Sequence, residues 1–130
     1  RFLAGRASDK YGRIRVLKVS TFLLVVAMGL IGLSTTATGL LLAAAVFGVA
    51  VGMNSPTVFA WTIDLSHPAH RGRAMATMYI ALEAGIGIGA LASGWLYAND
   101  ASMFPVVFWT GGVCAFLAFL YLIFVVRNKV

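Results

Sequence analysis

Four long apolar stretches divide the sequence, and short polar segments separate them. The stretches run from Val19 to Leu33, Leu40 to Ile63, Ala74 to Tyr97 and Phe104 to Val126. A helix needs about 20 mainly apolar residues to cross roughly 30 Å of hydrocarbon, at about 1.5 Å per residue. The stretches are also too uniformly apolar for the alternating strands of a membrane β-barrel. The pattern therefore predicts an all-α membrane protein with four transmembrane helices.

The composition favours the same class. Hydrophobic residues make up 61% of the 130 residues and charged residues 11%, and the mean hydropathy is +0.93. These values lie far outside the average of soluble proteins. The net charge of +6 does not indicate a nucleic-acid partner, because the aromatic residues lie in the apolar stretches and the bases between them. We expect membrane lipid and a small-molecule substrate as partners, and no nucleic acid.

The ten lysine and arginine residues occupy alternate polar segments. Six precede the first stretch, two lie between the second and third, two follow the fourth, and the remaining two segments have none. Loops rich in lysine and arginine stay in the cytoplasm. We therefore expect a multi-pass protein of the plasma or inner membrane, with both ends of the chain in the cytoplasm.

A charged segment from Gly5 to Leu17 precedes the first stretch and reads GRASDKYGRIRVL. It resembles the cytoplasmic signature of the major facilitator superfamily, G-x-L-a-D-[RK]-x-G-[RK]-[RK]-x-x-[IL]. The matching positions are Gly5, Asp9, Lys10, Gly12, Arg13 and Leu17. Ala7 and Ile14 depart from the pattern, and Arg15 partly replaces the base that is missing at Ile14. The resemblance implies a cytoplasmic gating motif formed by Gly5, Asp9, Lys10, Gly12, Arg13 and Arg15, in which Asp9 pairs with neighbouring bases.

Members of that superfamily have twelve helices in two six-helix halves, and the signature occurs after helix two and after helix eight. Ala44 stands where helix four would carry an arginine, and the run from Gly85 to Ala90 lacks the proline of helix five in exporters. These two departures favour the second copy. The resemblance then implies helices nine to twelve, with Arg71 to Ala74 opening helix eleven.

The expected organisation follows from this assignment. Residues 1–18 would form the end of a preceding helix and the signature loop, and residues 19–130 the four-helix transmembrane region. The sequence begins with Arg1 and shows no signal peptide, so we interpret it as a fragment of a longer chain. The partner of these four helices would then be the missing amino-terminal helices of the same chain.

Glu83 is the sharpest candidate for chemistry. It lies nine residues into the third stretch, which is about 14 Å along a helix and near the middle of the bilayer. A charged side chain there costs on the order of 2.5 to 3.5 kcal/mol, so it should face a cavity or a partner, or be protonated. Glu83 is therefore either a proton-coupling or cation-binding carboxylate, or a neutral side chain that locks two helices together.

Polar residues interrupt the second stretch near its middle, around Pro56. Because helix ten of the resembled family lines the central cavity, Asn54, Thr57 and Trp61 are candidates for contact with substrate. The alternative is a local kink at the proline, with the hydroxyl groups bonded to their own helix.

A boundary charge cluster lies between the second and third stretches and consists of Asp64, Arg71 and Arg73, with two histidines nearby. Asp64 can pair with Arg71, with Arg73 or with a base of the opening loop. His67 and His70 do not have the spacing of a metal-binding pair, and we expect no metal.

Two pairs of glycines have the four-residue spacing of close helix contacts: Gly48 with Gly52, and Gly85 with Gly89. We expect them to pack against other helices. The fourth stretch is rich in aromatic residues and carries no charge, so we expect it to face lipid.

Within the superfamily the chain resembles bacterial drug or sugar efflux permeases. This resemblance implies a secondary transporter that works by alternating access, with proton-coupled efflux of a small molecule or drug as its activity. No cofactor is expected, and the coupling ion would be the proton. One alternative is a complete four-helix exporter of the small multidrug type, although its glutamate lies in the first helix. Another is a noncatalytic membrane scaffold. An enzyme is not expected, because the sequence has no catalytic serine motif and no paired aspartates in adjacent stretches.

Overall fold

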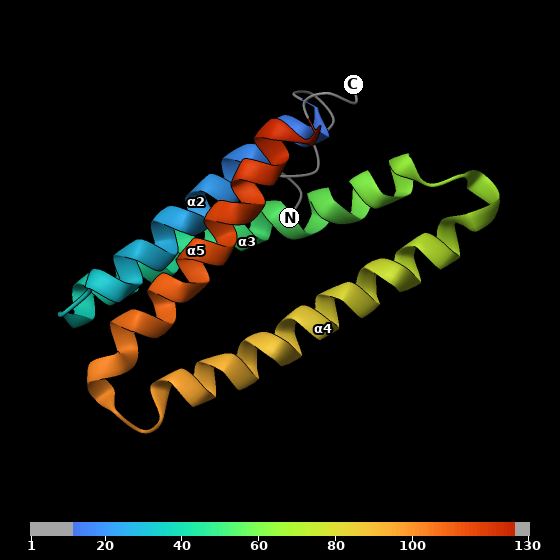
Figure 1. Ribbon diagram of the computed structural model, residues 1–130. Coiled ribbons are helices and arrows are strands. Elements are labelled where there is room, and N and C mark those ends of the chain that lie inside the picture. The colour runs from blue at the N-terminus through green and yellow to red at the C-terminus, as the bar shows by residue number, and fades with distance from the viewer. Residues whose placement is uncertain (1–11, 127–130) are drawn as a thin grey trace.

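The computed structural model describes residues 12–126, which form four long α-helices and two short 3-10 helices and contain no strand. The long helices are α2 (Arg13–Leu33), α3 (Ala37–Leu65), α4 (Arg71–Tyr97) and α5 (Phe104–Phe124). The short helices are η1 (Pro68–His70) and η2 (Ala101–Met103). Each long helix has the length and apolar character needed to cross a membrane. The predicted all-α membrane fold is confirmed (Figure 1).

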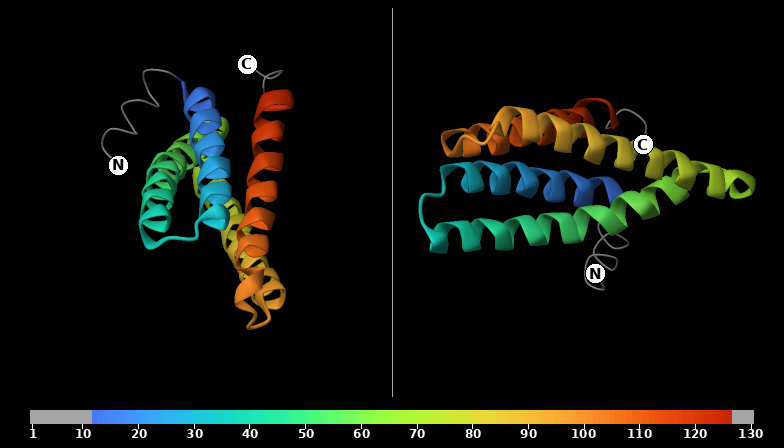
Figure 2. Two further views of the ribbon diagram at one scale, coloured as in Figure 1. Left: turned by 90° about the vertical axis from the view of Figure 1, so that its left-hand side faces the viewer. Right: turned by 90° about the horizontal axis from the view of Figure 1, so that it is seen from below.

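Helix α2 is the centre of the packing, and α4 lies to one side. Figure 2 shows α2 between α3 and α5, and these three helices run close together over most of their length. Helix α4 instead diverges from α3 beyond the η1 loop and contains no buried residue (Figure 1). The apolar surface of α4 is therefore available to lipid or to another helix.

Helix α2 begins earlier than the hydropathy pattern predicts. Gly12 has a φ of 88°, a left-handed conformation that suits glycine, and the helix starts at the next residue. Arg15 and Lys18 of the predicted signature loop are therefore helical. Hydropathy placed the boundary at Val19 because basic residues score as polar, although their long side chains can reach water from a helical backbone.

Helix α3 is continuous through the polar interruption around Pro56. The proline ring has no N–H, so the hydrogen bond to the carbonyl of Gly52 is lost at this point. The Thr57 hydroxyl donates to the carbonyl of Met53 at 2.7 Å and is itself almost fully buried. Figure 2 shows α3 changing direction along its length, as expected for a proline within a helix.

The link between α4 and α5 contains two residues in the left-handed region, Ala98 and Asn99, with φ of 43° and 61°. They end α4, and Asp100 then begins η2 by accepting a hydrogen bond from the Ser102 backbone N–H at 2.9 Å. Hydrogen bonding from Ser102, through its side chain first and its backbone N–H second, favours the charged carboxylate and holds the pKa of Asp100 below its ordinary value.

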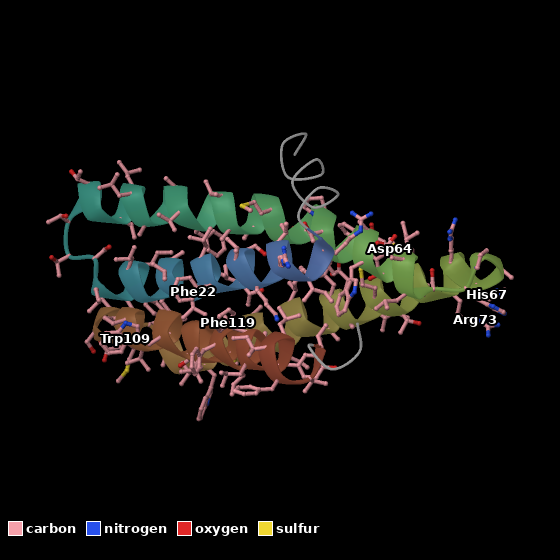
Figure 3. The ribbon with its side chains drawn as sticks, turned by 90° about the horizontal axis from the view of Figure 1, so that it is seen from above. Phe22, Asp64, His67, Arg73, Trp109 and Phe119 are labelled. Carbon is pink, nitrogen blue, oxygen red and sulfur yellow. The ribbon has the colours of Figure 1, made fainter. Side chains whose placement is uncertain are left out.

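The main apolar contacts join α5 to α2. Leu17, Leu122 and Val126 form a buried cluster. Further along, the rings of Phe22 and Phe119 lie 5.7 Å apart (Figure 3). The prediction that the fourth stretch faces lipid is therefore wrong for one side of α5, which packs on α2. On the remaining surface of α5 the exposed aromatic side chains are Phe116, Tyr121 and Phe124, whereas Trp109 is partly exposed but lies against α2.

A tight contact between α2 and α5 lies at Gly32. A Cβ atom at this position would lie 2.4 Å from Nε1 of Trp109 and 3.3 Å from the carbonyl oxygen of Pro105. One helical turn before Gly32, the Met28 side chain lies against Gly111 and Gly112 of α5. The contact at Gly32 depends on the absence of a side chain, whereas a Cβ atom at Gly111 or Gly112 would lie at an ordinary distance of 3.5–3.6 Å from Met28.

Candidate functional site

An ion pair joins the signature segment to the second helix of the structure. Arg13 Nε donates to Asp64 Oδ2, although the two residues are 51 positions apart. Asp64 lies near the end of α3, where this helix passes the start of α2 (Figure 3). The sequence left several partners open for Asp64, and in the structure the partner is Arg13, a base of the opening segment. The two side chains are 27% and 50% exposed, so water reaches the pair.

The remaining members of the signature divide between described and undescribed parts of the chain. Gly12 and Arg15 are described, and Arg15 is exposed on the first turn of α2. Gly5, Asp9 and Lys10 lie outside the described residues. The role predicted for Asp9 stays a prediction.

A buried polar contact crosses from α2 to α3 near the polar interruption. Ser20 is fully buried, and its hydroxyl donates to Asn54 Oδ1 at 3.2 Å and to the carbonyl of Leu17 at 3.1 Å. Its single hydrogen is shared between two acceptors. The Asn54 side chain therefore holds two helices together. Sequence reasoning did not select Ser20, whose only signal is a hydroxyl inside an apolar stretch.

The three residues predicted to contact substrate do not meet in one cavity. Asn54 lines a cavity of about 350 Å³ between α3 and α4. Trp61 lines a second cleft, of about 560 Å³, nearer the η1 loop, and also packs on the buried cluster of α2 and α5. Thr57 is buried and bonded to its own helix, as the kink alternative expects.

Glu83 lies in the middle of α4, on a helix whose side chains from residues 79 to 92 are all exposed. Within residues 12–126 no hydrogen-bond donor or base reaches its carboxylate. The expected cavity or partner for Glu83 is therefore not supplied by these four helices. A carboxylate at this depth needs a partner other than lipid.

The glycine pairs selected from the sequence are open in the structure. A Cβ atom at Gly48, Gly52, Gly85 or Gly89 would meet nothing within 4 Å. The expected close packing at these pairs does not occur among the described helices, where it occurs at Gly32 instead. The physical reason is geometric: spacing identifies a smooth helix face, and the neighbouring helix determines whether that face is used.

The boundary cluster surrounds the loop that joins α3 to α4. Arg71 and Arg73 open α4, and Asp64 pairs with neither of them, because its partner is Arg13. The rings of His67 and His70 lie 5.8 Å apart. In the described part of the chain no three histidine, cysteine or acidic side chains gather in a way that suits a metal ion.

Comparisons with known proteins agree with the fold. The family model described as Major Facilitator Superfamily matches residues 1–130. The chain is 34% identical over 115 residues to the 3-(3-hydroxy-phenyl)propionate transporter of Escherichia coli (strain K12). The aligned region covers 85% of the chain and 27% of that transporter. It is 35% identical over 94 residues to an uncharacterized MFS-type transporter of Mycobacterium tuberculosis (strain ATCC 25618 / H37Rv), covering 72% of the chain and 14% of the relative.

No solved structure gives a significant match. The chain spans 27% or less of the length of these curated relatives.

Proposed function

This chain belongs to the major facilitator superfamily, and we propose that it forms helices nine to twelve of a transporter that works by alternating access. The match over all 130 residues leaves the small multidrug exporter and the scaffold without support. The chain is part of a multi-pass membrane protein with four helices long enough to span. Its transport activity, its orientation and its membrane are part of the proposal.

The Arg13–Asp64 ion pair is the observation that carries the proposal. It links the signature segment to the end of α3, on the side that the positive-inside pattern predicts to be cytoplasmic. An ion pair open to water contributes about 0–1 kcal/mol, so it can break and form again in each transport cycle at little cost. We propose that this pair is a latch that closes the cytoplasmic side when the transporter opens outward.

Variants of the complete transporter test the latch. Asp64→Asn should lower the initial rate of transport several-fold and leave membrane insertion unchanged. Exchanging the two charges, Arg13→Asp with Asp64→Arg, should restore much of the rate because the pair can form again. Arg15→Gln removes a base from the same turn of α2 and is the matched control. Equal loss from Arg13→Gln and Arg15→Gln would show that general charge, and no specific latch, governs the rate.

Glu83 is the residue that we propose couples transport to protons. It is an acid in the middle of a spanning helix, and these helices supply no partner for it, so it is free to face a central pathway. Glu83→Gln keeps the shape but cannot titrate. In proteoliposomes with an imposed pH gradient, the variant should bind substrate and fail to concentrate it. Accumulation equal to that of the parent would assign Glu83 to packing.

We propose two candidate substrates, each supported by a different observation. Our first candidate is efflux of a small molecule or drug, which follows from the resemblance of the signature and helix pattern to bacterial efflux permeases. The second candidate is transport of a small aromatic acid, and it is favoured by the likeness to a transporter named for 3-(3-hydroxy-phenyl)propionate. Uptake of radiolabelled phenylpropionates, compared with extrusion of a cationic dye, separates the two.

A further inference from the structure

The cleft of about 560 Å³ between α3 and α4 has its basic side chains at one end. His67, His70 and Arg73 lie at this η1 end, where Figure 3 labels His67 and Arg73, and the rest of the wall is formed by the two helices. His67 Nδ1 accepts a hydrogen bond from the Ala69 backbone N–H at 3.3 Å. In the neutral ring the proton then resides on Nε2, so His67 presents a donor. This end of the cleft therefore offers hydrogen-bond donors and positive charge.

The wall of the cleft is effectively apolar although it contains three hydroxyl groups. The Thr62 hydroxyl donates to the carbonyl of Val58 at 2.9 Å and the Ser66 hydroxyl to that of Ile63 at 2.8 Å. The Thr77 hydroxyl donates to the carbonyl of Arg73 at 3.0 Å. Each hydrogen is used within its own helix. What remains for a ligand is the hydrophobic surface of Trp61, Leu65, Ala74, Met78 and Ala81.

The length of the groove corresponds to one leaflet of a bilayer. Met78 and Ala81 line both this cleft and the cavity of about 350 Å³ next to it, which extends to Leu82. From Arg73 to Leu82 is nine residues, or about 14 Å at ~1.5 Å per residue. Half of a hydrocarbon core of roughly 30 Å is about 15 Å. The charged end thus lies at the depth of lipid headgroups, and the apolar part reaches the bilayer centre.

We propose that this groove binds one anionic phospholipid of the cytoplasmic leaflet. The phosphate would lie among His67, His70 and Arg73, and an acyl chain would follow α4 past Met78. The cytoplasmic leaflet is the one that carries anionic lipid, and the positive-inside pattern places the η1 loop there. The site is separate from Glu83 and from the Arg13–Asp64 pair, so it does not depend on the proposed coupling or latch.

Charge excludes two other occupants. The opening segment of the chain, residues 1–11, has three bases and one acid, so its composition does not complement the basic end of the groove. A second copy of the chain would bring the same basic side to the same leaflet. A phospholipid offers the two chemistries that the groove needs, an anion at one end and an apolar chain along the other.

Quenching of Trp61 by brominated lipid tests the proposal. The complete protein is placed in nanodiscs with every tryptophan other than Trp61 replaced by phenylalanine, which in these 130 residues means Trp95 and Trp109. Brominated phosphatidylglycerol should reach half-maximal quenching at a roughly fivefold lower mole fraction than brominated phosphatidylcholine, since each nearby base contributes about that factor. Arg73→Gln should remove most of this preference, and Arg73→Lys should keep it.

Arg71→Gln is the matched control, because it removes the same charge two residues away, outside the cleft. It should change the preference less than twofold. Equal effects of Arg71→Gln and Arg73→Gln would overturn the site in favour of a diffuse surface potential. Displacement of the brominated lipid by inorganic phosphate at constant ionic strength would reassign it to a free anion. Absence of quenching by either lipid, in protein that elutes as a single folded species, would show that a protein segment fills the groove.

Discussion

Replacement of Gly32 by alanine tests the tight contact between α2 and α5. On the present backbone the added methyl carbon would lie 2.4 Å from Nε1 and 2.6 Å from Cδ1 of Trp109. Carbon atoms in good contact are about 3.5–4.0 Å apart, so one of the partners must move by about 1 Å. The carbonyl oxygen of Pro105 would lie 3.3 Å away, a tight contact that requires a further adjustment of a few tenths of an ångström. Overpacking of this kind costs about 1–3 kcal/mol.

Unfolding of the purified protein by SDS in mixed micelles, followed by far-ultraviolet circular dichroism, measures this cost. Gly32→Ala should unfold at a lower mole fraction of SDS, by an amount equivalent to about 1–3 kcal/mol. Gly29→Ala is the matched control on the same helix, because a Cβ atom there meets nothing within 4 Å. It should leave stability unchanged or raise it by up to about 1 kcal/mol, because alanine is the better helix former.

A double-variant cycle identifies the partner. In a Trp109→Ala background the methyl group meets no indole, so Gly32→Ala should cost clearly less than in the parent. If Gly32→Ala and Gly29→Ala have the same unfolding midpoint, α2 and α5 do not approach each other as described. If the cost is unchanged by Trp109→Ala, the clash is with the backbone at Pro105.

Two further predictions concern the loops. Single cysteines at Thr36 and Asn99, in a Cys114→Ser background, should react with an impermeant reagent added outside the cell, and a cysteine at Arg71 should not; the reverse pattern would invert the proposed topology. The hydrogen bond from Ser102 lowers the pKa of Asp100 in the folded state, so its contribution to stability is complete above the ordinary value of 3.8 and is lost as the pH falls below it. The difference in melting temperature between the parent and Asp100→Asn should therefore shrink on going from neutral pH to pH values below 3.8, and an unchanged difference would contradict this account.

The positions of the helices were predictable from the sequence, because the bilayer sets one length and excludes unpaired backbone groups. Their ends were less predictable. Hydropathy cannot separate a loop from the basic first turns of a helix, and so it missed the start of α2 at Arg13. The conformation of Gly12 determines this boundary, and hydropathy does not measure it.

For the contacts between helices, the sequence indicated several candidate partners for a residue but did not show which one is in contact. Asp64 had several bases within reach along the chain, and only the crossing of α2 and α3 selects Arg13. Spacing selected the pair Gly85 and Gly89, whereas the close approach is at Gly32, where a large indole lies over a single glycine. Local sequence describes the surface of each helix, and the arrangement of helices determines which surfaces meet.

The central place of α2 has a consequence for the timing of synthesis. Its contact with α3 can form as soon as that neighbouring helix is made, but its contact with α5 waits until α5 is complete, 91 residues after Leu33, at Phe124. At about 5–20 residues per second, the ribosome needs roughly 5–18 s to supply them. During that interval the smooth face at Gly32 and Met28 is open to lipid, and any passing helix with a suitable aromatic side chain competes with α5 for it.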